Sequence, residues 1–179
     1  MKGFGDKKNK GKNIKHLSDN FNNEKLIADA FKFHSQGKLS EASNIYKYLI
    51  KNGYKDPRIY INLGGIYQQN SNFKDAIILY KNVLKNFPNS PEVYSNLGKI
   101  CQVKSEFKEA TYYLKKAIEL KPDFLTAYQN LINVLISQGF LKEAENILNK
   151  CTHMFPNDFN TFINYGCVLK ELGKIKEAE

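Results

Sequence analysis

The chain has 179 residues, of which 42% are hydrophobic and 25% are charged, and its formal net charge is +9. This balance is typical of soluble globular proteins, and no apolar run approaches the roughly 20 residues of a membrane-spanning helix. The N-terminal segment 1–20 contains no apolar core of a signal peptide. We therefore expect a cytoplasmic protein without a membrane partner.

The segment 1–22 carries a large share of the positive charge. It contains six lysines against Asp6 and Asp19, together with three glycines. Few of its residues are apolar, which predicts a disordered basic tail at 1–22. A solvated linker is the favoured interpretation of the tail, and weak contact with acidic surfaces or RNA is the alternative.

The remainder of the chain is only mildly basic, with 21 basic and 16 acidic side chains. Arg58 is the single arginine among the 27 basic residues. Nucleic-acid-binding proteins usually use more arginine, because its planar guanidinium suits phosphates and guanine edges. We therefore expect no nucleic-acid partner. The opposite hypothesis predicts binding that weakens steeply as salt is added.

From residue 23 onward the sequence repeats at a fixed interval of 34 residues. YINLGGIY begins at Tyr60, and its close copy YSNLGKIC begins at Tyr94. Alanine also recurs at this interval from Ala42 to Ala178, and no insertion breaks the register. We expect one repeat domain at 23–179, divided into repeats 23–56, 57–90, 91–124, 125–158 and a truncated 159–179.

Each repeat contains two segments whose apolar residues are spaced three and four apart, which predicts amphipathic helices. In the second repeat these helices are expected at about 57–70 and 73–86. Proline at position 32 of the repeat ends the second helix, because proline cannot donate a backbone hydrogen bond. Small residues at positions 8, 20 and 27 allow neighbouring helices to approach closely, so enlarging Ala110 should overpack the contact.

This pattern resembles the tetratricopeptide repeat (TPR) family over residues 23 to 179. The third repeat carries the family residues most completely: Tyr94, Leu97, Gly98, Cys101, Phe107, Ala110, Leu114, Ala117 and Pro122. The resemblance implies an all-α fold, a right-handed superhelical solenoid of antiparallel helix pairs. It also implies a concave inner surface that is lined by the first helix of each repeat.

The fifth repeat stops at Glu179, when its second helix has only begun as KIKEAE. A helix of that length is marginal without packing, and repeat arrays normally end with a polar capping element. We therefore expect a fragment of a longer protein, and a natural stop with a frayed end is the alternative.

No catalytic constellation stands out. His34 and His153 lack neighbouring ligands at metal-binding spacing. The three cysteines are widely spaced, and we interpret them as buried small hydrophobic residues rather than disulfide or zinc ligands. We expect no catalytic residue, no metal site and no cofactor, and we expect this stretch not to be an enzyme by itself.

The most informative polar residues form a ladder of asparagines at position 6 of the repeat. A carboxamide offers both a donor and an acceptor, as does each residue of an extended peptide. The ladder resembles that of the TPR region of O-linked N-acetylglucosamine transferases, which implies that the amides hold a peptide backbone. An inherited ladder without a ligand is an equally good interpretation. The ladder residues are Asn62, Asn96, Asn130 and Asn164.

Other residues of the first helices complete the predicted peptide-binding surface. They could add further amides, or positive charge that attracts an acidic segment. These residues are Arg58, Gln69, Lys99, Gln102 and Asn133.

Two functions follow from these observations. The first is a scaffold module for protein–protein interaction that binds a peptide or protein segment in the concave groove. The alternative is the N-terminal substrate-recognition arm of a longer enzyme: an O-linked N-acetylglucosamine transferase-like glycosyltransferase, a sulfotransferase or a hydroxylase. The sequence names neither the partner nor the oligomeric state, because a repeat fold alone implies no particular ligand.

Overall fold

The computed structural model describes residues 23–173. The predicted basic tail, 1–22, lies outside these residues, and so does the segment 174–179, where the sequence predicts the start of the fifth repeat's second helix. Every regular element within 23–173 is a helix, so the predicted all-α class is confirmed.

Helices of 13 and 14 residues alternate along the chain from α3 onward. Residues 23–35 are helical, and the later helices are α2 (Leu39–Lys51), α3 (Pro57–Gln69), α4 (Phe73–Asn86), α5 (Pro91–Val103), α6 (Phe107–Leu120), α7 (Leu125–Ser137), α8 (Leu141–Met154) and α9 (Phe159–Glu171). The helices α3, α5, α7 and α9 begin at the first residue of each predicted repeat from the second onward. We call these the first helices of their repeats and α2, α4, α6 and α8 the second helices.

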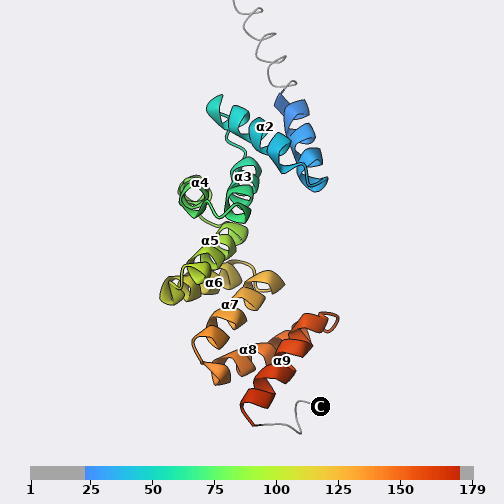
Figure 1. The fold of residues 1–179 in the computed structure, drawn as a ribbon, viewed down its shortest axis with the longest axis vertical. Coiled ribbons are helices and arrows are strands. Elements are labelled where there is room, and N and C mark those ends of the chain that lie inside the picture. Colours follow the sequence, from blue (N-terminus) through green and yellow to red (C-terminus); the bar gives the residue numbers. More distant parts are fainter. Residues whose placement is uncertain (1–22, 174–179) are drawn as a thin grey trace, which may run out of the picture. The chain divides into compact units, whose positions relative to one another are not determined.

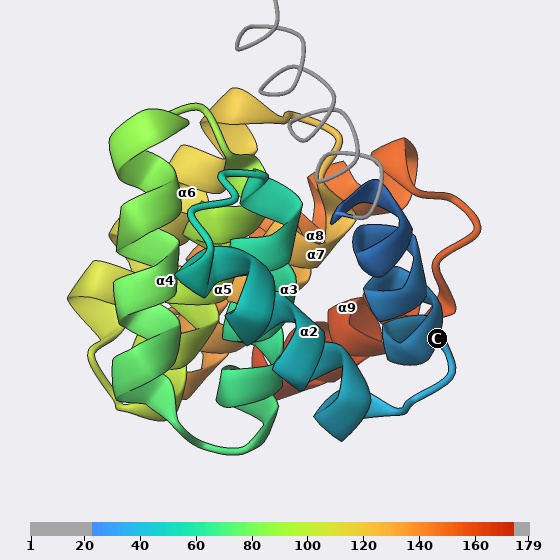
Figure 2. The same ribbon diagram turned by 90° about the horizontal axis from the view of Figure 1, so that it is seen from above.

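The chain forms two compact units, one ending at Leu79 and the other beginning at Tyr80. In the first unit, α2 packs against α3, and helix 23–35 contributes Ile27 and Ala30 to the same core. In the second unit, each helix from α5 to α9 packs against the next along the chain (Figures 1 and 2). Each unit therefore has a hydrophobic core of its own, which stabilises its helices more than their short length could.

Local sequence signals set where these helices begin. Pro57 and Pro91 occupy the first helical position of α3 and α5, where a missing N–H costs nothing. The Asp56 carboxylate accepts a hydrogen bond from the backbone N–H of Arg58 at 2.9 Å, and so caps α3.

The turn after each first helix needs a residue with a positive φ angle. Glycine adopts this conformation at little cost, whereas other residues are strained in it. Ser71 and Ser105 hold φ angles of 59° and 60° at this position. The equivalent residues of the other repeats are Gly37, Gly139 and Gly173.

Small residues mark the close contacts between helices, as the sequence predicts. Ala110 in α6 is fully buried. A Cβ atom added to Gly98 in α5 would lie 2.6 Å from Cγ of Leu114, which is closer than real carbon atoms approach. The backbone of α5 therefore lies directly against side chains of α6, and a larger residue at either position must push the helices apart.

The cysteines differ from the prediction at one position. Cys101 and Cys151 are buried, as expected, but Cys167 is exposed on α9. The prediction was wrong for Cys167 because its side chain lies on the solvent-facing side of α9, whereas the next two residues, Val168 and Leu169, are buried. Residues 23–173 contain no cluster of His, Cys, Asp or Glu that could hold a metal ion. None of the described helices is long and apolar enough to cross a membrane.

Candidate partner-binding surface

The candidate residues lie along one side of each first helix. An α-helix turns about 100° per residue, so positions 2, 6, 9 and 13 fall within about 60° of one another. Arg58, Asn62 and Gln69 occupy positions 2, 6 and 13 of α3. We call this side the amide stripe; each of the two units has its own. Its members in the second unit are Asn96 and Lys99 on α5, Asn130 and Asn133 on α7, and Asn164 on α9, with Gln102 beside them.

The ladder asparagines are less accessible than their neighbours. All four are half-buried, as is Gln102. The remaining members are exposed: Arg58, Gln69, Lys99 and Asn133. Each asparagine thus lies at the boundary between the helix contacts and the solvent, where its amide can turn either way.

Asn62 turns its amide inward. Its Nδ2 donates a hydrogen bond to the hydroxyl of Tyr46 at 3.2 Å. Tyr46 is fully buried, and its hydroxyl in turn donates to the carbonyl oxygen of Ala30 at 3.4 Å and lies 3.3 Å from Nδ1 of His34. Burial raises the pKa of Tyr46, and the bond from Asn62 partly opposes this shift. One donor of Asn62 therefore satisfies a core hydroxyl and is not available to a partner.

Asn96 repeats this arrangement in the second unit. Its side chain hydrogen-bonds to Tyr80, which is fully buried and occupies the repeat position that Tyr46 occupies in the preceding repeat. Burial raises the pKa of Tyr80 far above its usual value, and Asn96 again partly opposes the shift. The first two ladder asparagines thus connect a first helix to a tyrosine of the preceding second helix.

The last two ladder asparagines have no such tyrosine. Leu114 replaces it before α7, and Nδ2 of Asn130 instead lies 3.4 Å from the hydroxyl of Ser95. The side chain of Asn164 makes no hydrogen bond to any residue between 23 and 173. The four asparagines are therefore not equivalent, because the residue at position 24 of the preceding repeat decides where the amide points.

The two cations of the stripe also differ. Arg58 is paired with Asp56, with 2.5 Å between its guanidinium nitrogen and the carboxylate oxygen, and it lies 5.2 Å from the centre of the Phe31 ring. This arrangement raises the pKa of Arg58 and lowers that of Asp56. Lys99 is exposed and forms no ion pair within 23–173. Lys99 is thus the freer of the two to meet a partner's acidic group.

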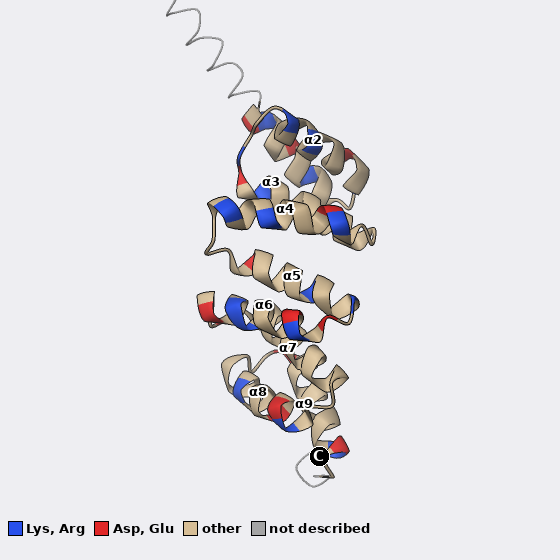
Figure 3. Ribbon diagram, turned by 90° about the vertical axis from the view of Figure 1, so that its left-hand side faces the viewer, with Lys and Arg blue, Asp and Glu red and all other residues tan. Residues whose placement is uncertain are grey.

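Charge is distributed unequally between first and second helices. Figure 3 shows blue and red segments together on α6 and α8. By contrast, α7 contains no lysine, arginine, aspartate or glutamate at all. The stripe on α7 consequently offers neutral amides, which suits hydrogen bonding to a peptide backbone more than charge recognition.

Sequence reasoning identified the asparagines but not their buried partners. The missed signal is the tyrosine at position 24 of the first two repeats, Tyr46 and Tyr80, where the third and fourth repeats carry Leu114 and Leu148. A buried tyrosine needs a hydrogen-bond partner for its hydroxyl, whereas leucine needs none. Comparing positions 6 and 24 of the repeats together would have distinguished the two asparagines that bond to a buried tyrosine, Asn62 and Asn96, from the other two.

Family models of the tetratricopeptide repeat match residues 35–91, 66–123 and 104–162. Together these matches cover most of the chain. They confirm the predicted repeat family, and they do not bear on the finer resemblance to O-linked N-acetylglucosamine transferases. No curated protein matches the chain.

Solved structures with the same fold include MamA, with a TM-score of 0.73 and 25% identity over 83% of this chain and 87% of that chain. PilF of Pseudomonas aeruginosa has a TM-score of 0.77 and 16% identity over 87% of this chain and 71% of that chain. A thermophilic TPR protein of Thermus thermophilus has a TM-score of 0.68 and 15% identity over 87% and 86% of the two chains. These likenesses confirm the repeat solenoid as the fold class.

Proposed function

We propose, because the chain belongs to the tetratricopeptide repeat family, that it binds an extended segment of a partner protein along the amide stripe of its second unit. The family establishes the coarser role: the repeats form a protein–protein interaction scaffold, and the stretch is not itself an enzyme. The finer proposal concerns which residues make the contact and what they contact.

One observation carries the proposal. Asn133 is exposed and Asn164 half-buried, and neither side chain bonds to the part of the chain that the structure describes. Their donors and acceptors are thus open to a partner, and Asn130 is held only by the 3.4 Å contact with Ser95. An extended peptide presents one N–H and one C=O per residue, which matches a row of carboxamides. We assign the principal contact to these three asparagines.

The other members play a smaller part in this proposal. Asn62 and Asn96 support buried tyrosines, so their main contribution is to the fold. Lys99 and Gln102 on α5 add a charge and an amide to the stripe of the second unit. Arg58 and Gln69 belong to the stripe of the first unit, which we treat as a surface of its own. A substrate-recognition arm of a longer enzyme would use the same surface, so this alternative stays a hypothesis about the parent protein.

The test begins with peptides selected from a random library on the full chain. We expect the combined substitution Asn130→Ala, Asn133→Ala and Asn164→Ala to weaken binding about tenfold or more, since each lost hydrogen bond costs about 0.5–1.5 kcal/mol. Asn146→Ala is the matched control, because Asn146 is an exposed asparagine on α8. Circular dichroism melting confirms that the variants remain folded.

A second measurement separates backbone from side-chain recognition. N-methylation of the selected peptide's central amides should abolish binding, whereas alanine replacement of its side chains should reduce binding only modestly. Unchanged affinity of the triple variant, or peptide contacts that map to α6 and α8, would contradict the proposal.

A further inference from the structure

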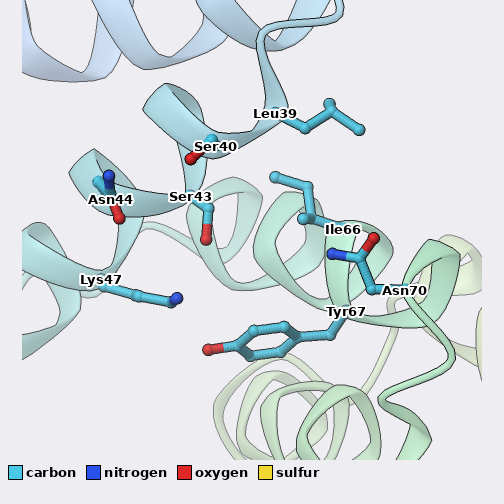
Figure 4. A pocket seen from close by; sticks show the side chains of 8 residues that line it. All are labelled: Leu39, Ser40, Ser43, Asn44, Lys47, Ile66, Tyr67 and Asn70. Carbon is cyan, nitrogen blue, oxygen red and sulfur yellow. The ribbon is translucent and has the colours of Figure 1, made fainter.

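A pocket of about 380 Å³ lies between α2 and α3 in the first unit (Figure 4). It is separate from the amide stripe. Tyr67, which forms one wall, lies five residues after Asn62, or about 140° further around the helix. The residues that line the pocket are Leu39, Ser40, Ser43, Asn44, Lys47, Ile66, Tyr67 and Asn70.

The pocket wall is rich in hydrogen-bond donors. Two serine hydroxyls, two carboxamides and one ammonium group surround it, and no aspartate or glutamate is among the lining residues. Lys47 extends over the Tyr67 ring, with its nitrogen 5.5 Å from the ring centre. Within 23–173 no carboxylate pairs with Lys47, so its charge is uncompensated.

Ser43 provides a second and independent observation. Its relative exposure is 7%, so it is more than nine-tenths buried. Its hydroxyl has no hydrogen-bond partner in the described part of the chain. Every side-chain nitrogen or oxygen there that is fully shielded from solvent does have a partner, so the Ser43 hydroxyl is not fully shielded. The hydroxyl therefore meets solvent in the pocket, and Figure 4 shows it directed toward the space between Lys47 and Tyr67. A hydroxyl that has no partner in the protein can bond to a ligand that replaces this solvent.

We propose that this pocket binds the carboxylate of a glutamate or aspartate side chain in a partner protein. A single cation matches the single negative charge of a carboxylate better than the higher charge of a phosphate group. The Ser43 hydroxyl and the neighbouring amides can donate to the carboxylate oxygens. Leu39 and Ile66 provide an apolar surface for the methylene groups of the acidic side chain. The pocket thus gives the first unit a contact that is independent of the amide stripe.

The test is an NMR titration of the full ¹⁵N-labelled chain with N-acetyl-glutamate-N-methylamide. Its neutral counterpart, N-acetyl-glutamine-N-methylamide, is the matched control. We expect saturable shifts of the backbone amides around Ser43, Lys47 and Tyr67 with the glutamate compound and none with the glutamine compound. Equal effects of the two compounds would overturn the proposal.

Variants test the assignment of the residues. Lys47→Gln and Ser43→Ala should each weaken the binding of the glutamate compound at least about fivefold, and both remove little that the fold needs. Lys51→Gln, an exposed lysine of the same helix outside the pocket, should have no effect. Equal weakening by Lys51→Gln would show a diffuse charge effect and overturn the proposal. Tighter saturable binding of inorganic phosphate at the same amides would overturn the choice of a carboxylate.

Discussion

Asn62 and Asn164 occupy the same position of their repeats but have different neighbours. The Asn62 side chain donates to the buried hydroxyl of Tyr46 at 3.2 Å, whereas the Asn164 side chain has no hydrogen-bond partner within 23–173. Residue type and spacing are therefore insufficient to assign a role to a ladder residue. The partner across the helix contact decides whether the amide supports the fold or remains open to a ligand.

This difference predicts unequal costs of substitution. Asn62→Ala should lower the free energy of unfolding by about 1 kcal/mol, because the Tyr46 hydroxyl loses a donor in a buried site. Asn164→Ala should change it by less than about 0.5 kcal/mol. Urea unfolding followed by circular dichroism measures both. If Tyr46→Phe removes most of the difference, the effect comes from this bond, and equal costs for the two asparagines would contradict the assignment.

A second residue-scale prediction concerns the turn after α5. Ser105 has a φ angle of 60°, which is strained for a residue with a Cβ atom. Ser105→Gly should stabilise the protein by about 1 kcal/mol, although glycine's greater freedom in the unfolded chain offsets part of the gain. Ser137→Gly, at the last residue of α7, should destabilise it instead. Thermal melting of the two variants should give shifts of opposite sign, and equal shifts would contradict the argument.

At the scale of the helices, the two sides of a first helix have different roles. The first helix α5 places Gly98 against Leu114 of α6, which leaves no room for a Cβ atom. The solvent-facing side of a first helix is not restricted by such packing. On α7 this side carries uncharged amides. Close contact on one side and polar exposure on the other are both consequences of the helical period.

Enlarging a residue at the helix contact should destabilise the fold. Ala110 is fully buried in α6, so Ala110→Leu should lower the free energy of unfolding by about 1–3 kcal/mol through overpacking. Lys108→Leu makes a matched change at an exposed position of the same helix and should cost less than about 0.5 kcal/mol. A melting temperature of Ala110→Leu equal to that of the unsubstituted protein would contradict the packing described here.

At the scale of the whole molecule, the buried ionisable groups contribute to the dependence of stability on pH in the alkaline range. Burial raises the pKa of Cys151 to about 11, and burial together with the charge of Glu106 does the same for Cys101. In the unfolded chain both thiols lose their protons near their ordinary value of 9.0. Between these values the unfolded state binds fewer protons than the folded state, so stability falls as the pH rises.

We therefore expect nearly constant stability contributions from these thiols below pH 9 and a loss between about pH 9 and 11. Each thiol should contribute about 1–3 kcal/mol to that loss. The buried hydroxyls of Tyr46 and Tyr80, whose pKa values are raised from the ordinary value of 10.0, act in the same direction from about pH 10 upward. Urea unfolding under reducing conditions at several pH values measures the slope, and Cys151→Ala should make it shallower. A slope unchanged by this substitution would contradict the attribution.

The repeat period, the alternation of helices and the repeat family could all be predicted from the sequence, because helical periodicity, proline and small residues act over a few neighbouring positions. The environments of individual side chains could not. Asn62 faces Tyr46 from 16 residues away, and the pocket joins Ser43 and Lys47 on α2 to Tyr67 on α3. Cys167 was expected to be buried and is exposed. Such outcomes depend on which helices pack together and at what distance. Only the tertiary structure decides this, because helices pack through contacts between residues that are far apart in the sequence.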